Sequence, residues 1–181
     1  MYQPAYQKLL SYKYCDYIFL LTKEFTVRFL AGRENLRQRE QMDHAARSAK
    51  QCLAEGASQK TSLKGYIKML GVSRGSLEEL LEDFKDLARL RKITIWDQEG
   101  LRRMRGLRIF VNQDQNPLSP PPPLPQDIDL AVNVMIDLIM RTNYILDQQR
   151  KSLEEKHMKE GGYTEQLYQR RVEYRRLREG G

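Results

Sequence analysis

The sequence has little of what several protein classes require. It contains two cysteines, Cys15 and Cys52, so a disulfide framework is not expected and a reduced, cytoplasmic location is favoured. No run approaches the roughly 18–20 apolar residues that span a membrane, and residues 1–10 lack the basic-then-apolar order of a signal peptide. His44 and His157 form no metal-ligand spacing with the cysteines, so we expect no metal site and no cofactor.

Motifs of common catalytic sites are also missing. There is no phosphate-binding glycine loop, no dinucleotide-binding glycine motif and no zinc-protease motif. His44 and Cys52 fall on one expected helix, but eight positions separate them by about 12 Å along the axis, too far for a catalytic dyad. We therefore expect that the protein is not an enzyme. The alternative is a metal site made by carboxylates on converging helices, which a metal analysis of the purified protein would test.

The composition and charge favour a helical protein with an anionic partner. Hydrophobic residues make up 40% of the chain and charged residues 30%, which suits long helices around a modest core. Lys and Arg number 31 against 24 Asp and Glu, so the formal net charge is +7. A positive surface of this kind permits binding to nucleic acid without identifying it.

Apolar residues recur at three- and four-residue steps in four segments, which predicts four helices. These segments are residues 4–31, 35–54, 61–90 and 127–155. The second carries mostly small residues on its apolar stripe, which would let a neighbouring helix approach closely. We expect Gly56 to end the second helix, Thr61 or Ser62 to cap the third, and Asp127 to lie at the start of the fourth. The predicted fold class is all-α, an antiparallel four-helix bundle.

A proline-rich linker and a basic tail complete the expected organisation. Six of the seven prolines lie between residues 112 and 125, within a predicted linker over 91–126. Residues 120–123 are expected to form a polyproline II spacer, the alternative being a ligand for a proline-binding domain. The bundle then covers residues 1–155. Residues 156–181 form a basic C-terminal extension that is helical, lies on a neighbouring subunit, or is disordered when alone.

Two arginine clusters are the candidate nucleic-acid contacts, because guanidinium groups bind phosphates without reading sequence. They are Arg102, Arg103, Arg105 and Arg108 in the linker, and Arg170, Arg171, Arg175 and Arg176 in the tail. The alternative is that these arginines form a solvated or subunit-contacting surface. The five tyrosines from Tyr2 to Tyr17 are interpreted as core or interface residues, with base stacking as the alternative.

One polar pair is expected inside the bundle. Arg47 follows the alanine stripe of the second helix, and Glu79 borders the stripe of the third. If Arg47 is partly buried it needs a carboxylate partner, because an isolated buried charge is costly. We predict a structural contact between Arg47 and Glu79. A surface pair worth less than about 1 kcal/mol is the alternative.

A longer pattern resembles a known family. Its residues are Gln41-Met42, Ala45-Ala46-Arg47-Ser48, Gln51, Ala54-Glu55-Gly56, Thr61-Ser62 and the run from Ser76 to Asp83. Their order and spacing resemble the bacterial four-helix bundle suffix-domain family. That family is similar to the proteins encoded in intervening sequences of large-subunit ribosomal RNA genes and to the accessory variability proteins of diversity-generating retroelements. Cys52-Leu53 departs from the family pattern, which has Asn-Ile there, so any role of that position is open.

The resemblance implies an antiparallel four-helix bundle that assembles into a ring, often a homopentamer. Retroelement accessory proteins use a basic ring surface to bind nucleic acid and a reverse transcriptase, and none of these relatives is an enzyme by itself. The function we expect is therefore a non-catalytic, oligomeric adaptor that binds RNA or DNA by electrostatics and has a reverse transcriptase as a candidate partner. The alternative is a protein-only scaffold or assembly module.

Overall fold

The structure is a computed structural model that describes residues 4–59, 62–97, 99–101 and 120–179. In these residues all regular secondary structure is helical, with five complete α-helices and two short 3-10 turns and no strand. The elements are η1 (Ala5–Lys8), α1 (Leu10–Phe29), η2 (Arg33–Asn35), α2 (Leu36–Ser58), α3 (Leu63–Arg91), α5 (Ile128–Glu160) and α6 (Tyr163–Glu179). The all-α prediction is confirmed for this part of the chain.

Helix starts lie close to the positions that the capping residues indicate. The Ser62 hydroxyl accepts a hydrogen bond of 3.0 Å from the Gly65 amide and caps α3. The Asp127 carboxylate accepts one of 2.8 Å from the Leu130 amide and caps α5. Both side chains satisfy amide groups that have no partner within the first helical turn.

Three predicted boundaries are wrong. The first helix is not continuous over 4–31, because Leu9 is extended and separates η1 from α1. The second helix does not end at Gly56 but continues to Ser58, and the fourth runs to Glu160 instead of 155. Gly56 serves packing: an added Cβ would lie 2.8 Å from the Met69 Cβ and 2.9 Å from the Tyr66 ring. The small side chain therefore allows α2 and α3 to approach closely.

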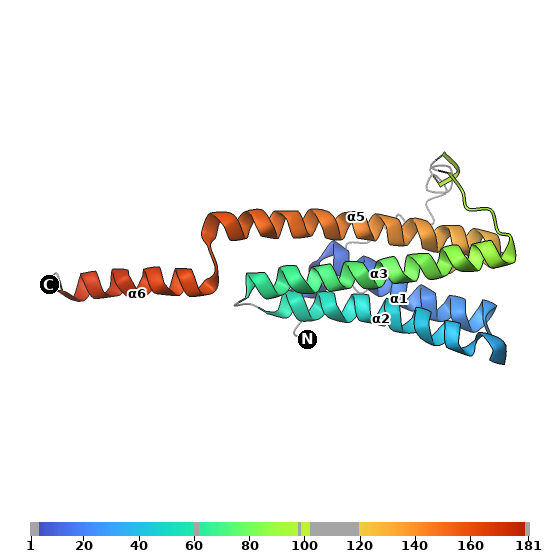
Figure 1. The fold of residues 1–181 in the computed structure, drawn as a ribbon, viewed down its shortest axis with the longest axis horizontal. Helices are drawn as coiled ribbons and strands as arrows, with labels where there is room; N and C mark the ends of the chain where they lie inside the picture. Colours follow the sequence, from blue (N-terminus) through green and yellow to red (C-terminus); the bar gives the residue numbers. More distant parts are fainter. Residues whose placement is uncertain (1–3, 60–61, 98, 102–119, 180–181) are drawn as a thin grey trace.

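Helices α1, α2, α3 and α5 make up the part of the molecule that we call the helical core. They contact one another in a closed cycle, α1 with α2, α2 with α3, α3 with α5, and α5 with α1. Figure 1 shows them side by side, with successive helices running in opposite directions. Phe25 and Phe84 are fully buried at its centre, with ring centroids 5.0 Å apart. Most of the apolar area that the described residues bury lies here.

The helical core also fixes the non-helical residues that flank the undescribed part of the chain between α3 and α5. Asn133 is fully buried on α5, where its amide donates to the carbonyl oxygens of Thr94 and Asp129 and its oxygen accepts from the Trp96 amide. Before α5, the Arg28 guanidinium donates to the Leu124 and Pro125 carbonyl oxygens at 3.1 and 2.9 Å. Residues 93–97 and 120–125 are therefore anchored to the core by side chains.

Helix α6 differs from the other helices. It follows a turn at Gly161, whose φ of 71° is the left-handed conformation that suits glycine. The Gly162 amide donates to the Glu165 carboxylate, which satisfies one amide at the start of α6. Figure 1 shows α6 extending past the end of the helical core, and none of residues 163–178 is buried. The basic extension that the sequence predicts is thus a helix over most of its length.

Candidate nucleic-acid interface

The charges of α6 are segregated around the helix. It carries five arginines and three glutamates. At about 100° per residue, four of the arginines fall within an arc of roughly 140° together with one tyrosine. These residues, which we call the basic face, are Arg170, Arg171, Tyr174, Arg175 and Arg178, and they line one surface depression. The three glutamates, Glu165, Glu173 and Glu179, lie outside that arc.

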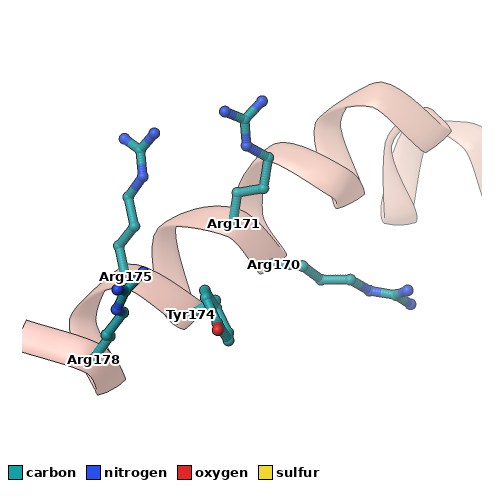
Figure 2. Close-up of a pocket in the computed structure, with 5 residues that line it drawn as sticks. All are labelled: Arg170, Arg171, Tyr174, Arg175 and Arg178. Atoms are coloured by element: carbon teal, nitrogen blue, oxygen red, sulfur yellow. The ribbon is translucent and has the colours of Figure 1, made fainter.

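The basic face is an open surface. Figure 2 shows Arg171 and Arg175 projecting in the same direction, while Tyr174 and Arg170 project on the other side of the ribbon in this view. All four arginines are exposed, and the Tyr174 side chain is 68% exposed. Because one helix supplies every group, the depression suits contact with a long anionic ligand better than enclosure of a small one.

The structure refines the arginines that the sequence singled out in the tail. Arg170, Arg171 and Arg175 lie together on the basic face, but Arg176 lies on the opposite side of α6, three residues from both Glu173 and Glu179. Arg178 and Tyr174 were not among the predicted site residues, although both belong to this face. Helical spacing alone would have found them, since Arg171, Tyr174, Arg175 and Arg178 follow one another at steps of three, one and three residues.

The other predicted cluster cannot be compared with the basic face. Arg102, Arg103, Arg105 and Arg108 lie outside the residues that the structure describes. Leu101, the last described residue before them, is buried at 5% exposure. The prediction that this cluster contacts nucleic acid stays a prediction.

The structure does not bring Arg47 and Glu79 together. Both side chains are exposed, and no ion pair joins them in the described part of the chain. Arg47 follows Ala46 in sequence but is turned about 100° from it around α2, which places it away from the buried stripe. An exposed arginine needs no buried carboxylate, so the reason for the predicted contact is absent.

Other ion pairs link neighbouring helices. Arg74 on α3 contacts Asp147 on α5 at 3.0 Å and Glu78 at 3.2 Å, and Asn143 donates to the same Glu78 carboxylate. Lys50 on α2 contacts Asp16 on α1 at 2.5 Å. These groups are partly exposed, and they are already satisfied by partners inside the chain. They hold helices in register and are poor candidates for a ligand site.

The chemistry available for nucleophilic catalysis is limited in the described residues. Cys15 is fully buried, and burial raises the pKa of its thiol to about 12, so it stays protonated and unreactive. The Cys52 thiol lies beside the Ser48 hydroxyl, and the hydroxyl oxygens of Ser48 and Ser76 lie 2.9 Å apart between α2 and α3. Within the described residues, no group of three histidine, cysteine or acidic side chains is arranged to hold a metal ion.

Comparisons with known proteins add no functional assignment. No family model, curated protein or solved structure matches the chain. Among the helices that the structure describes, none combines the length and the apolar character needed to cross a membrane.

Proposed function

We propose that this protein is a non-catalytic adaptor that binds RNA or DNA by electrostatics and assembles into a ring. The observation that supports nucleic-acid binding most directly is the basic face of α6, where four exposed arginines lie on one side of a projecting helix. Nucleic-acid backbones carry regularly spaced negative charges, and such a face neutralises several phosphates at once. It carries no groove-reading motif, so sequence specificity is not part of the proposal.

The proposed assembly extends the resemblance of residues 41–83 to the suffix-domain family. In it, the helical core is an antiparallel four-helix bundle, with the proline-rich linker before α5, and copies of the bundle surround a ring axis, five being the number that the resemblance favours. A ring repeats the basic face around its axis, which multiplies a modest charge per chain into a strong positive field. A reverse transcriptase is the partner that the resemblance implies.

A salt series on the full-length protein tests nucleic-acid binding. We expect the affinity for a labelled 20-nucleotide RNA to fall steeply as the salt concentration rises. In a plot of the logarithm of the binding constant against the logarithm of the salt concentration, each phosphate contact that a variant loses should make the slope shallower by about 0.7. The double variant Arg171→Gln/Arg175→Gln should bind more weakly with a shallower slope. Arg176→Gln removes one charge from the opposite side of α6; it is the matched control for the single variant Arg171→Gln and should change the slope least.

Failure of this test has a defined form. Absence of binding at low salt, or an equal effect of Arg176→Gln and of the single variant Arg171→Gln, contradicts binding at the basic face. Native mass spectrometry of the same protein tests the ring, for which we expect a single oligomer of about five chains. A monomer would contradict the assembly while leaving nucleic-acid binding intact.

A protein-only scaffold is the second candidate function. The observation that favours it is a row of exposed apolar residues on α6, Tyr163, Leu167, Tyr174 and Leu177, whose spacing of four, seven and three residues is close to that of a coiled-coil seam. Deleting residues 163–181 separates the two functions. A change in the number of chains per oligomer with no change in nucleic-acid affinity supports a scaffold, whereas loss of affinity with an unchanged number of chains supports the proposed function.

A further inference from the structure

The tyrosines that the structure describes differ in their surroundings. Those near the N-terminus have aromatic partners: Tyr6 contacts Tyr12 with centroids 4.9 Å apart, and Tyr14 contacts Tyr17 at 6.5 Å. Tyr174 makes no ring contact in the described part of the chain and is 68% exposed. A large aromatic ring that nothing covers, between arginines, is an unused stacking surface.

We propose that Tyr174 stacks on a nucleobase and that the basic face of α6 is a site for single-stranded nucleic acid. This inference rests on the proposed function and names its substrate class. The arginines bind the phosphates and the ring takes an unpaired base, the combination by which proteins hold single strands without reading their sequence. Tyrosine suits this role because its ring is rigid and loses little conformational entropy on contact.

Single strands fit this arrangement better than a duplex. In a duplex both faces of each base are covered by neighbouring base pairs, so a ring beside the backbone finds only the edges of bases and the phosphates. A single strand can unstack and present a base to Tyr174 while its backbone follows the arginines on either side. The arginines contribute to the binding of single strands and of duplexes, and only the Tyr174 side chain favours the single strand over the duplex.

The position of the arginines also argues against a membrane surface as the ligand. A helix that lies on a bilayer has an apolar centre to its buried face and basic residues at the borders. Here Arg170 lies about 40° from Tyr174 and about 20° from Leu177, inside the row of exposed apolar residues Tyr163, Leu167, Tyr174 and Leu177. Insertion of this row into a bilayer would place the Arg170 guanidinium in the apolar layer, which is costly. Nucleic-acid phosphates instead contact this guanidinium group at the helix surface, where its charge stays exposed to solvent.

The test measures, in the full-length protein, how removal of the aromatic side chain of Tyr174 changes binding relative to control variants. Fluorescence anisotropy measures binding to a labelled 20-nucleotide oligouridylate and to an RNA hairpin duplex of equal length. We expect Tyr174→Ala to weaken oligouridylate binding by roughly 5- to 150-fold without changing the salt slope, and to change duplex binding by less than about 2-fold. Tyr174→Phe should bind as the wild type does, because the ring remains.

The control variant is Tyr144→Ala. Tyr144 is 67% exposed on α5, away from the basic face, so its removal should leave oligouridylate binding unchanged. Alanine favours helix more than tyrosine does, so a loss at position 174 does not come from unfolding of α6. Circular dichroism of each variant verifies that the helical content is retained.

The outcomes separate this inference from the proposed function. If the wild type binds oligouridylate with a steep salt slope and Tyr174→Ala binds equally well, the stacking role is wrong and electrostatic binding stands. Equal affinity for oligouridylate and duplex, both unaffected by Tyr174→Ala, has the same meaning. If the wild type binds neither RNA at low salt but binds vesicles of phosphatidylserine and phosphatidylcholine, both proposals are wrong.

Discussion

The helical core and α6 are both helical, but they are stabilised in opposite ways. Each helix of the core buries a stripe of apolar side chains against two neighbours, and Phe84 on α3 also contacts Phe25 on α1, across the cycle. In α6, none of residues 163–178 is buried, and the arginines, tyrosines and leucines are exposed to solvent. Packing therefore accounts for the core, whereas α6 depends on helix propensity and on local bonds such as that from Gly162 to Glu165.

This difference separates side chains that contacts within the chain explain from side chains that such contacts do not explain. A side chain in the core is fixed by its neighbours, so its identity is explained by contacts within the chain. The side chains of α6 have few such contacts, and their segregated charge has no structural explanation inside one chain. Substitutions in the core and in α6 test this contrast, and it is wrong if α6 also contributes to the stability of the core.

The largest effect is expected in the middle of the core. Phe84→Ala removes a fully buried ring and should lower the free energy of unfolding by about 3–5 kcal/mol. Leu177→Ala removes a side chain that is 75% exposed on α6 and should change it by less than about 0.5 kcal/mol. Urea unfolding followed by circular dichroism measures both. A large loss for Leu177→Ala would mean that α6 is packed against something in solution.

A smaller loss is expected where the segment after α3 is anchored. Asn133→Ala removes the partner of the Trp96 amide and of the Thr94 carbonyl, which should cost about 2–3 kcal/mol. Trp96 is the single tryptophan of the chain, so its fluorescence should shift to the red as the segment loosens. Gln148→Ala, an exposed substitution on the same helix, should leave both stability and fluorescence unchanged. A silent Asn133→Ala would show that residues 93–97 are held by other contacts.

Two glycines in the helical core should respond in opposite directions. Gly56→Ala places a Cβ against Met69 and Tyr66 and should destabilise the protein by about 1–3 kcal/mol. Gly75→Ala meets no atom within 4 Å on the outer side of α3 and should stabilise it by about 1 kcal/mol. Thermal unfolding of the two variants gives the sign directly. Destabilisation by Gly75→Ala would indicate that another chain approaches α3 at this point.

The sequence predicts the helices well because their signals are local. The apolar stripe of α3 and the residues at the starts of α3 and α5 depend on neighbours within one or two turns. Ser62, one of the two expected caps, caps α3, and Asp127 lies at the start of α5 as expected. Gly56 was expected both to belong to the small-residue stripe of the second helix and to end that helix. Its close approach to α3 agrees with the first expectation, and the continuation of α2 to Ser58 contradicts the second. Its contacts with Tyr66 and Met69 come from a different helix.

Contacts between distant segments could not be derived in this way. The bonds of Asn133 to residues 94 and 96 cross the undescribed segment between α3 and α5, and no periodicity indicates them. The Arg47–Glu79 contact was expected from adjacency to apolar stripes, but adjacency in sequence turns a side chain by about 100°. In contrast, the basic face of α6 can be derived from helical spacing alone. The sequence was therefore sufficient to include Arg178 among the predicted site residues and to leave out Arg176.

The smallest effect is expected at a carboxylate on the border of the core. Burial, with Glu79 and Asp86 nearby, raises the pKa of the Asp83 carboxyl to about 6. The folded state therefore keeps this proton between about pH 4 and 6, where the unfolded state has lost it, so stability falls as pH rises through that window. Asp83 is partly exposed and screened by solvent, so Asp83→Asn should stabilise the protein by about 1 kcal/mol at pH 7 and by nothing at pH 3.5. Urea unfolding at the two pH values measures this. An equal gain for Asp83→Asn at both pH values would mean that ionisation is not the cause.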